Sequence, residues 1–249
     1  FSFNRGIWCR LFNGCNYYKM LVIIGASSGI GLSLIKSFSK HDDIIAFYNS
    51  NKPKALKNSK KFKIYFEKVD LSKKNNFDKI FKKYEAKMKK VVCINLAAKP
   101  LDKLLINISY KEVSKIFNIN TFSNIMICKS LLKYMIADNW GRLIHFTSTK
   151  ALKGDAGVSV YSSSKSSLLG YSNSLAKEYG RFNITSNVIS LGYFNSPMWN
   201  RLSDKKKQKL LSEVPIKSTG NIQNIIKTIK FIKDTEYLNG SNIKLDGGI

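Results

Sequence analysis

The sequence predicts an α/β fold in which a doubly wound, seven-stranded parallel sheet carries helices on both faces. Two observations predict it. Short β-branched and aromatic runs alternate with helical segments from residue 20 onward, and no repeat or low-complexity linker interrupts them. Such alternation is typical of βαβ units, whose crossover helices cover a parallel sheet. With 249 residues and 44% hydrophobic content, the chain can bury one large core, so we expect a single domain over residues 20–249.

The predicted elements follow in order along the chain. The seven strands are the short apolar runs at residues 20–26, 43–49, 63–70, 90–98, 141–148, 184–190 and 242–248. The spacing of apolar residues predicts helices over 29–40, 75–88, 109–137 and 159–180, and near 203–212 and 221–233. The basic stretch between the second and third strands is expected as helix or loop.

Residues 1–19 are expected to lie outside the fold as an N-terminal extension. They contain no acidic residue and no clear periodicity, and Met20 stands directly before the first strand. They lack the continuous apolar core of a secretory signal, while their basic character leaves an organelle transit peptide open. Apolar runs elsewhere are far shorter than the roughly 20 residues that cross a bilayer. We therefore expect a soluble, cytoplasmic protein without membrane contact.

The cysteines and histidines do not have the spacing of metal ligands, so no metal site is expected. These residues are Cys9, Cys15, Cys93, Cys128, His41 and His145. Cys93 and Cys128 lie in apolar segments and are interpreted as buried free thiols, which fits a reducing compartment.

The formal net charge of +26 arises from 37 lysines and only 5 arginines. Such a bias is also typical of an AT-rich genome. Residues 52–90 carry 15 lysines against four acidic residues, which predicts a basic lobe. A solvated face is the first interpretation, attraction of an anionic substrate or carrier the second, and nucleic-acid binding the third. Nucleic acid is not the expected partner, because no recognition module for it is evident.

The first strand runs directly into the glycine-rich loop "GASSGIG", residues 25–31, which opens the first helix. Gly25 permits the tight turn, Gly29 lets the backbone approach a phosphate, and Gly31 lets the helix pack on the strand. The helix N-terminus offers amide groups to a pyrophosphate. With a strand before and a helix after, the pattern predicts a Rossmann-type dinucleotide site. Ser27, Ser28 and Ile30 complete the loop's expected cofactor contacts.

The three residues between the first two glycines depart from G-x-G-x-x-G and resemble the loop of the short-chain dehydrogenases/reductases. The family's active-site set of Asn, Ser, Tyr and Lys is also matched. Asn120 precedes Ser148 by 28 residues, Ser148 precedes Tyr161 by 13, and Lys165 follows Tyr161 by four. Taken singly, each of these residues is more often structural. The resemblance covers residues 20–249 and implies an NAD(P)-dependent oxidoreductase.

The chemistry explains the need for these residue types. Reducing a ketone by hydride leaves an alkoxide, which needs a proton donor and polar contacts that strengthen as charge develops. Tyr161 would be the donor, and we expect the nearby Lys165 ammonium to lower the pKa of its phenol. The resemblance implies that Lys165 also holds the nicotinamide ribose, that Ser148 bonds the substrate oxygen, and that Asn120 holds a water linking Lys165 to solvent.

The nucleotide is expected to be NADP(H) rather than NAD(H). The second strand ends at Asn49 and Ser50, where an acidic residue would bond the ribose hydroxyls of NAD. Lys52 and Lys54 follow, and these cations favour the extra phosphate of NADP, unless they belong only to the general lysine excess.

Further cofactor contacts are implied by the resemblance. The expected residues are Asp70, Leu71, Asn95, Ala97, Gly192, Phe194 and Ser196. Four residues depart from the family pattern: Ile24 stands for Thr before the glycine loop, Leu96 for Asn and Ala98 for Gly after the fourth strand, and Leu191 for Pro before Gly192. We expect Leu96 to affect local stability more than catalysis, and Leu191 to make its loop less rigid.

Within the family, the sequence most resembles the 3-oxoacyl-[acyl-carrier-protein] reductases of fatty-acid synthesis. The stretch "AAKPLDKLL" is similar to theirs, and Lys177 and Arg181 fall where basic residues often receive the acidic carrier. The main alternative is reduction of a sugar or polyketide-type ketone in a surface-polysaccharide or secondary pathway. From other classes, a cofactor-binding scaffold and a basic nucleic-acid-binding protein stay open.

The substrate lid is expected at residues 196–215, because this is where the family varies. Met198, Trp199 and Leu202 are interpreted either as the lining of an apolar substrate pocket or as packing residues. By analogy with the family we expect a homotetramer or homodimer.

Overall fold

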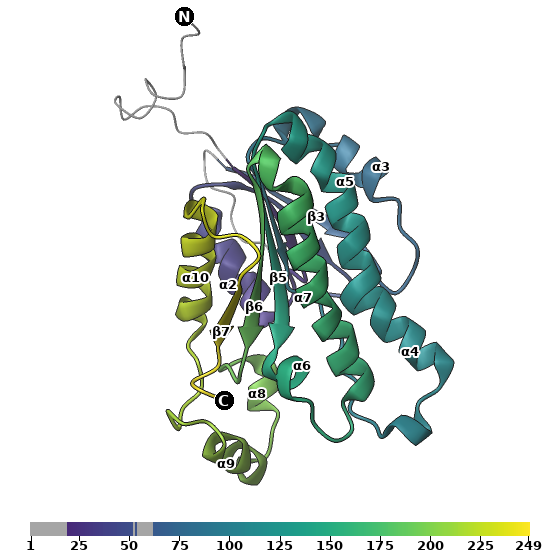
Figure 1. The fold of residues 1–249 in the computed structure, drawn as a ribbon, viewed down its shortest axis with the longest axis vertical. Coiled ribbons are helices and arrows are strands. Elements are labelled where there is room, and N and C mark those ends of the chain that lie inside the picture. The colour runs from purple at the N-terminus through teal and green to yellow at the C-terminus, as the bar shows by residue number, and fades with distance from the viewer. Residues whose placement is uncertain (1–18, 52, 54–61) are drawn as a thin grey trace, which may run out of the picture.

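The computed structural model describes residues 19–51, 53 and 62–249, except for the side chain of Met198. Its sheet has seven parallel strands in the order β3-β2-β1-β4-β5-β6-β7 (Figure 1). The strands are β1 (Met20–Ile24), β2 (Asp43–Tyr48), β3 (Ile64–Lys68), β4 (Val91–Asn95), β5 (Gly141–Ser148), β6 (Ile184–Leu191) and β7 (Asn242–Leu245). The predicted fold class is confirmed. Residues 1–18 of the predicted extension, and with them Cys9 and Cys15, lie outside the described residues, as do Lys52 and Lys54.

Helices cover both faces of the sheet. They are α2 (Gly29–Phe38), α3 (Phe77–Lys82), α4 (Tyr110–Phe117), α5 (Ser123–Ala137), α6 (Thr149–Lys153), α7 (Ser159–Tyr179), α8 (Pro197–Asn200), α9 (Asp204–Ser212) and α10 (Ile222–Asp234). Figure 1 shows α2 and α10 on one face and α4, α5 and α7 on the other. Because the connections run from β1 outward in both directions, the strand order reverses between β1 and β4. Ligands of open α/β sheets bind at such a switch point.

Each face of the sheet has its own hydrophobic core, and the alternation along β1 shows how they are separated. Val22 packs with residues of α3 and α5, whereas Leu21 and Ile23 pack with residues of α2 and α10. The central strands are buried on both sides, which explains their continuous apolar sequences. Cys93 and Cys128 are both buried and free, as predicted.

The predicted continuous helix over 109–137 is wrong in its middle. Ser109 and Glu112 form a capping box that begins α4, but a π-helical turn over Asn118–Phe122 separates α4 from α5. The turn places two side chains against α7: the Asn120 amide donates to Ser164 Oγ at 2.9 Å, and Thr121 Oγ1 donates to the Ser164 carbonyl at 2.8 Å. These tertiary bonds favour the wider turn, and π turns are often found at functional sites.

Two other helical segments also differ from the expectation. The helix predicted over 75–88 is shorter, with α3 followed by a 3₁₀ turn over Glu85–Lys87. The five-residue α6 was not predicted, and it forms because Ser148 caps its first turn by accepting a hydrogen bond from the Lys150 amide.

Gly31 and Gly170 provide a matched pair of glycines for testing how closely α2 packs on β1. A Cβ at Gly31 would lie 2.5 Å from the Gly25 carbonyl oxygen and 2.9 Å from Cα of Ala26. Because both neighbours are backbone atoms, we expect Gly31→Ala to lower the free energy of unfolding by about 1–3 kcal/mol. A Cβ at Gly170, inside α7, would meet nothing within 4 Å, so Gly170→Ala should raise it by about 0.5–1 kcal/mol. Urea unfolding measures the free energy of unfolding of both variants. Equal changes in the two variants would contradict the close packing of Gly31 on β1.

Candidate active site

A cavity of about 380 Å³ lies at the carboxyl ends of β1 to β4, at the switch point of the sheet. Seven predicted cofactor-binding residues line it: Gly25, Ser27, Ser28, Asn49, Asp70, Leu71 and Ala97. Eight further lining residues lie beyond the predicted set: Phe47, Tyr48, Val69, Leu96, Ala98, Lys99, Pro100 and Ile119. The structure therefore brings the glycine loop together with the ends of three neighbouring strands.

The glycine loop is shaped by backbone contacts that admit no side chain. Gly25 has a φ of +89°, and a Cβ there would lie 3.0 Å from the Ala97 backbone nitrogen. Ser28 caps α2: its Oγ accepts from the Gly31 amide at 3.0 Å and donates to the Gly25 carbonyl at 2.8 Å. The first turn of α2, including Ile30, therefore begins beside the cavity, with its dipole positive at that end. A Cβ at Gly29 would meet the Pro197 ring at 2.7 Å, so α8 approaches this loop closely.

The end of β2 forms one end of the cavity. Asn49 lines it, and Ser50 is exposed in the bend that follows. Asp70 is the one carboxylate among the lining residues described, and its Oδ1 accepts from the amide and the hydroxyl of Ser72 at 3.0 and 2.7 Å. These hydrogen bonds lower the pKa of Asp70 and fix the carboxylate in place.

Leu96, which differs from the family pattern after β4, is accommodated by packing. Leu96 donates its amide to the Ile24 carbonyl at 3.0 Å, and its side chain packs against the core under α2 and α10. An apolar side chain is therefore suited to this position. Asn95 is buried at the end of β4, and its Nδ2 has no hydrogen-bond partner in the described part of the chain.

Three predicted cofactor residues lie apart from the cavity, in the segment after β6. The Gly192 amide donates to the Leu245 carbonyl at 2.9 Å. Phe194 is buried and packs over Gly220. Ser196 Oγ accepts from the Trp199 amide at 3.3 Å, and the Trp199 ring lies against Tyr193 at a tilt of 37°. The structure thus places Gly192 and Phe194 just before the expected lid, and Ser196 at its first residue.

The four predicted catalytic residues converge around the first turns of α7. Ser148 ends β5, and its hydroxyl lies near enough to the Tyr161 phenol to lower the pKa of that phenol. Lys165 is buried one turn further along α7, and its carbonyl accepts from Thr147 Oγ1 at 3.1 Å. Asn120 reaches the same turn through Ser164. Residues from three elements are therefore held within one small volume.

The expectation that the pKa of Tyr161 is lowered is wrong for this arrangement. Burial raises the pKa of the phenol, Asp102 raises it slightly further, and the hydrogen bond to Ser148 acts in the opposite direction. The Lys165 charge is not among the causes. Burial also lowers the pKa of Lys165 to about 8, because no carboxylate or other acceptor among the described residues compensates its charge.

The serine-rich sequence of α7 joins the helix to its neighbours. Ser162 Oγ donates to the Lys150 carbonyl at 2.8 Å, and Ser166 Oγ donates to the Ala151 carbonyl at 2.5 Å, so both tie α7 to α6. Ser164 Oγ donates to the Tyr161 carbonyl at 2.7 Å while it accepts from Asn120. These hydrogen bonds therefore hold in place the part of α7 that carries Tyr161 and Lys165.

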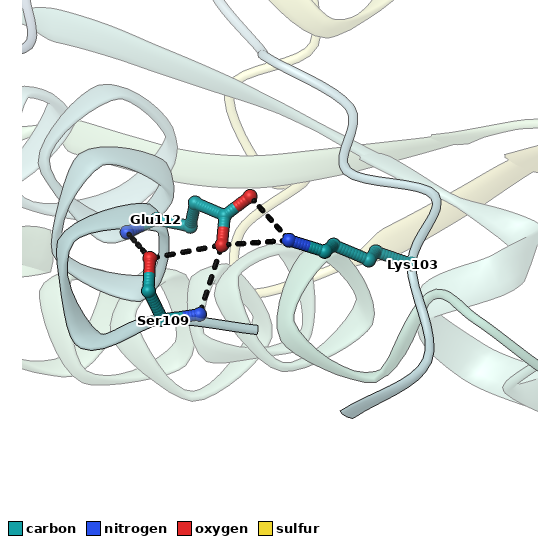
Figure 2. Close-up of polar contacts among 3 residues, drawn as sticks. All are labelled: Lys103, Ser109 and Glu112. Carbon is teal, nitrogen blue, oxygen red and sulfur yellow. Dashed lines mark hydrogen bonds and ion pairs between the residues drawn. The ribbon is translucent and has the colours of Figure 1, made fainter. Parts of the chain in front are cut away.

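The loop between β4 and α4 is fixed at several points. The Asn120 side chain accepts from the Lys99 amide at 2.7 Å and donates to the Lys99 carbonyl at 3.2 Å. The Lys103 amide donates to the Gly157 carbonyl at 2.7 Å, just before α7. Figure 2 shows the Lys103 ammonium against both oxygens of Glu112, which also accepts from Ser109 in the capping box. One wall of the cavity is thereby tied to α4 and α7.

A row of buried polar side chains lies between α7 and the sheet, and the sequence pattern did not predict it. His145 Nε2 lies 3.2 Å from Ser186 Oγ, which lies 2.8 Å from Ser172 Oγ. His145 Nδ1 has no hydrogen-bond partner among the described residues. Burial, with a smaller effect of the Lys165 charge, lowers the pKa of His145 to about 3.

These residues fit a nicotinamide dinucleotide. The close approach of Gly25 to Ala97 and the capped N-terminus of α2 leave room and donors for a pyrophosphate. The Lys165 ammonium is buried without an acceptor among the described residues, so it can donate to hydroxyl groups of a ligand. The fold and the site thus define a dinucleotide-binding oxidoreductase.

Comparison with known proteins gives the family. A family model described as short chain dehydrogenase matches residues 19–207. The chain therefore belongs to the short-chain dehydrogenase family, and it is an oxidoreductase of the kind that uses NAD(P)(H). A solved structure titled "short chain dehydrogenase/reductase family protein" shares the fold, with a TM-score of 0.78 at 20% identity over 92% of this chain and 96% of that one.

Named relatives are similar over nearly their full length. The 3-oxoacyl-[acyl-carrier-protein] reductase FabG of Buchnera aphidicola is 32% identical, covering 93% of this chain and 97% of that protein. FabG of Chlamydia muridarum is 28% identical with the same coverage. Carbonyl reductase family member 4 of Xenopus laevis is 28% identical, covering 93% of this chain and 98% of that protein.

Two kinds of feature are absent from the described residues. No helix in them is both long and apolar enough to span a membrane. No group of three or more His, Cys, Asp or Glu side chains in them is placed to hold a metal ion.

The depressed pKa of His145 predicts a loss of stability in acid. Between pH 6.5 and about 3 the unfolded chain binds a proton at this residue that the folded chain does not. The free energy of unfolding therefore falls as the pH drops through this window, by up to about 1.4 kcal/mol per pH unit from His145 alone. Urea unfolding between pH 7 and 4 should show a flatter dependence in His145→Gln than in the wild type. His41→Gln, at an exposed position, is the control, and equal slopes for wild type and His145→Gln would contradict the assignment.

Proposed function

We propose that this protein is an NADP(H)-dependent reductase that converts a ketone to a secondary alcohol, with Tyr161 as the proton donor. One observation supports this most directly. The Ser148 hydroxyl lies near enough to the Tyr161 phenol to lower the pKa of that phenol, and Lys165, buried one turn along α7, has no acceptor among the described residues. Asn120 links this group to Lys99, on the wall of the dinucleotide-sized cavity.

Each residue has a proposed role in proton transfer. A bound reduced nicotinamide would supply the hydride. Because its pKa is raised, the Tyr161 phenol stays protonated at neutral pH and can donate to an alkoxide. Ser148 would hydrogen-bond the same oxygen and stabilise its developing charge. The Lys165 ammonium would hold ribose hydroxyls, and its contact with ligand oxygens would raise its pKa again.

Asn120 is proposed to act mainly by positioning. Its side-chain amide is engaged by Lys99 and Ser164, so it fixes the start of α7 against the wall of the cavity. The expected water beside Asn120, linking Lys165 to solvent, stays a prediction.

The proposed substrate is a 3-oxoacyl thioester carried by an acyl carrier protein, in fatty-acid synthesis. The names of the FabG relatives support this choice, and Lys177 and Arg181 are exposed at the end of α7, where an acidic carrier would find cations. The test compares 3-oxoacyl thioesters with sugar ketones, using NADPH. Activity on sugar ketones alone would support the main alternative and remove the thioester assignment.

We also propose a homotetramer or homodimer in the cytoplasm. Large apolar side chains are exposed from the loop before α4 to the first turn of α5: Leu104, Leu105, Ile106, Tyr110, Phe122 and Met126. Exposed apolar side chains gathered in one stretch of the chain support a subunit interface there. Residues 196–215 are proposed as the lid, formed by α8, α9 and the turn that follows.

Replacement of the proposed proton donor should abolish ketone reduction without affecting the binding of the cofactor. We expect Tyr161→Phe to lower kcat/KM for ketone reduction by about 10²–10⁴-fold, because the alkoxide loses its donor. Binding of NADPH, measured by fluorescence titration, should change little. Tyr237→Phe, at a fully exposed tyrosine between α10 and β7, is the matched control and should behave as the wild type. Full turnover by Tyr161→Phe would exclude the proposed mechanism.

A carboxylate at the end of β2 should reverse the nucleotide preference. In Asn49→Asp, repulsion of the ribose phosphate should raise the KM for NADPH about tenfold, the equivalent of about 1.4 kcal/mol. The KM for NADH should fall or stay unchanged, because an acidic residue accepts from the ribose hydroxyls. Asn49→Ser controls for loss of the amide. An unchanged ratio of kcat/KM for the two nucleotides would count against NADP(H) selection at this position.

A further inference from the structure

Lys99 is the one cation among the described residues that line the cavity at the switch point, and it lies beyond the residues that the sequence predicts to bind the cofactor. Its ammonium makes no hydrogen bond or ion pair with another described residue. Asp70, the carboxylate of the same lining, is held by Ser72 instead. A cation that lines a cavity without a partner in the described part of the chain is available to an anionic ligand.

The backbone of Lys99 is held at both of its polar groups, so the side chain starts from a fixed position. The Asn120 side chain accepts from the Lys99 amide at 2.7 Å and donates to the Lys99 carbonyl at 3.2 Å. Pro100 follows directly and restricts Lys99 to extended backbone conformations. Because these contacts use main-chain atoms, a substitution of the Lys99 side chain leaves them intact.

The strand order places Lys99 and Asn49 on opposite sides of the glycine loop. Strands β2 and β4 pair with β1 on its two sides, so Ile24 is the register partner of both Phe47 and Asn95. Neighbouring strands lie about 4.8 Å apart, so the ends of β2 and β4 are about 10 Å apart, with the glycine loop between them. Asn49, where the ribose phosphate of NADP is expected, follows β2, whereas Lys99 follows β4. The two residues therefore serve different parts of a ligand that crosses the loop.

The pyrophosphate is the anionic group that a dinucleotide would bring closest to Lys99. The glycine loop and the N-terminus of α2 offer donors for it, and a Cβ at Gly25 would lie 3.0 Å from the Ala97 nitrogen. Lys99 comes two residues after Ala97, which places it at most about 7 Å further along the chain. The flexible four-carbon stem of lysine can bring the ammonium back across this distance.

We propose that the Lys99 ammonium binds the pyrophosphate of the nicotinamide dinucleotide from the β4 side of the glycine loop. The proposal rests on the cofactor of the function proposed above. Helix α2 offers amide donors at its N-terminus, and Lys99 adds a full positive charge from the neighbouring strand. Lysine acts toward phosphate as a point charge, so its approach needs no exact angle. Since NADH and NADPH share the pyrophosphate, Lys99 strengthens the binding of both and does not select between them.

Equilibrium binding of NADPH and NADH, measured by fluorescence titration without a ketone substrate, tests the site. Lys99→Met keeps a stem of similar length and removes the charge. It should raise the Kd for both nucleotides about two- to fivefold, as expected for an exposed charge pair. The increase should shrink at high salt, which screens the charge in the wild type. Lys99→Arg should restore most of the affinity, because it restores the charge.

Two further variants are the controls for this measurement. Lys227→Met removes one charge from an exposed position on α10 and should change neither Kd. Asn49→Asp should weaken the binding of NADPH alone. A rise in Kd for NADPH only in Lys99→Met would place the ammonium at the ribose phosphate and overturn the proposal. Unchanged affinity for both nucleotides would overturn it as well.

The result for this site is separate from the result for the reductase function, because binding needs no turnover. A wild type that binds both nucleotides but reduces no ketone would exclude the reductase function, and the titrations would still decide the role of Lys99. A wild type that binds neither nucleotide would overturn both. Urea unfolding of Lys99→Met should match the wild type, since Asn120 bonds only the backbone of Lys99. Weaker binding together with a lower free energy of unfolding would indicate a structural role and overturn the site.

Discussion

The fixed position of α7 against the sheet is the constraint on which the rest of the site depends. Tyr161 and Lys165 can act together only if the first turns of α7 are held in one position relative to Ser148. Polar contacts do this, from Thr147 on β5 and from Asn120 and Thr121 on the π turn. Apolar packing alone would permit sliding and rotation, whereas hydrogen bonds to named backbone and side-chain atoms fix both.

The same contacts explain why the wall of the cavity and the first turns of α7, which carry Tyr161 and Lys165, form one unit. Asn120 holds Lys99 on the wall with two hydrogen bonds and Ser164 on α7 with a third. Lys103 adds a bond to Gly157 and an ion pair to α4. The ion pair is partly exposed and contributes little to stability by itself. Its effect is to limit where the loop can lie.

Much of the fold could be predicted from the sequence, because buried parallel strands leave uninterrupted apolar runs and Gly25 has a backbone role that other residues do not fill. The π turn could not, because "NINTF" contains no helix breaker and the turn depends on Ser164 and Lys99, which are distant in sequence. The far wall of the cavity was missed for a similar reason. Lys99 and Pro100 reach it from the loop after β4, and Ile119 reaches it from the π turn.

The four catalytic candidates could be named from their spacing, but their electrostatics could not, since burial is a property of the whole fold. Burial raises the pKa of Tyr161 and lowers that of Lys165 to about 8, so the phenol becomes the weaker acid of the two. At neutral pH the phenol keeps its proton and most of the lysine keeps its charge. A protonated phenol beside Ser148 is suited to giving a proton to an alkoxide, whose pKa is far higher. In the proposed reaction, taking a proton from an alcohol would first require ionising the buried phenol, whereas giving a proton to an alkoxide would not.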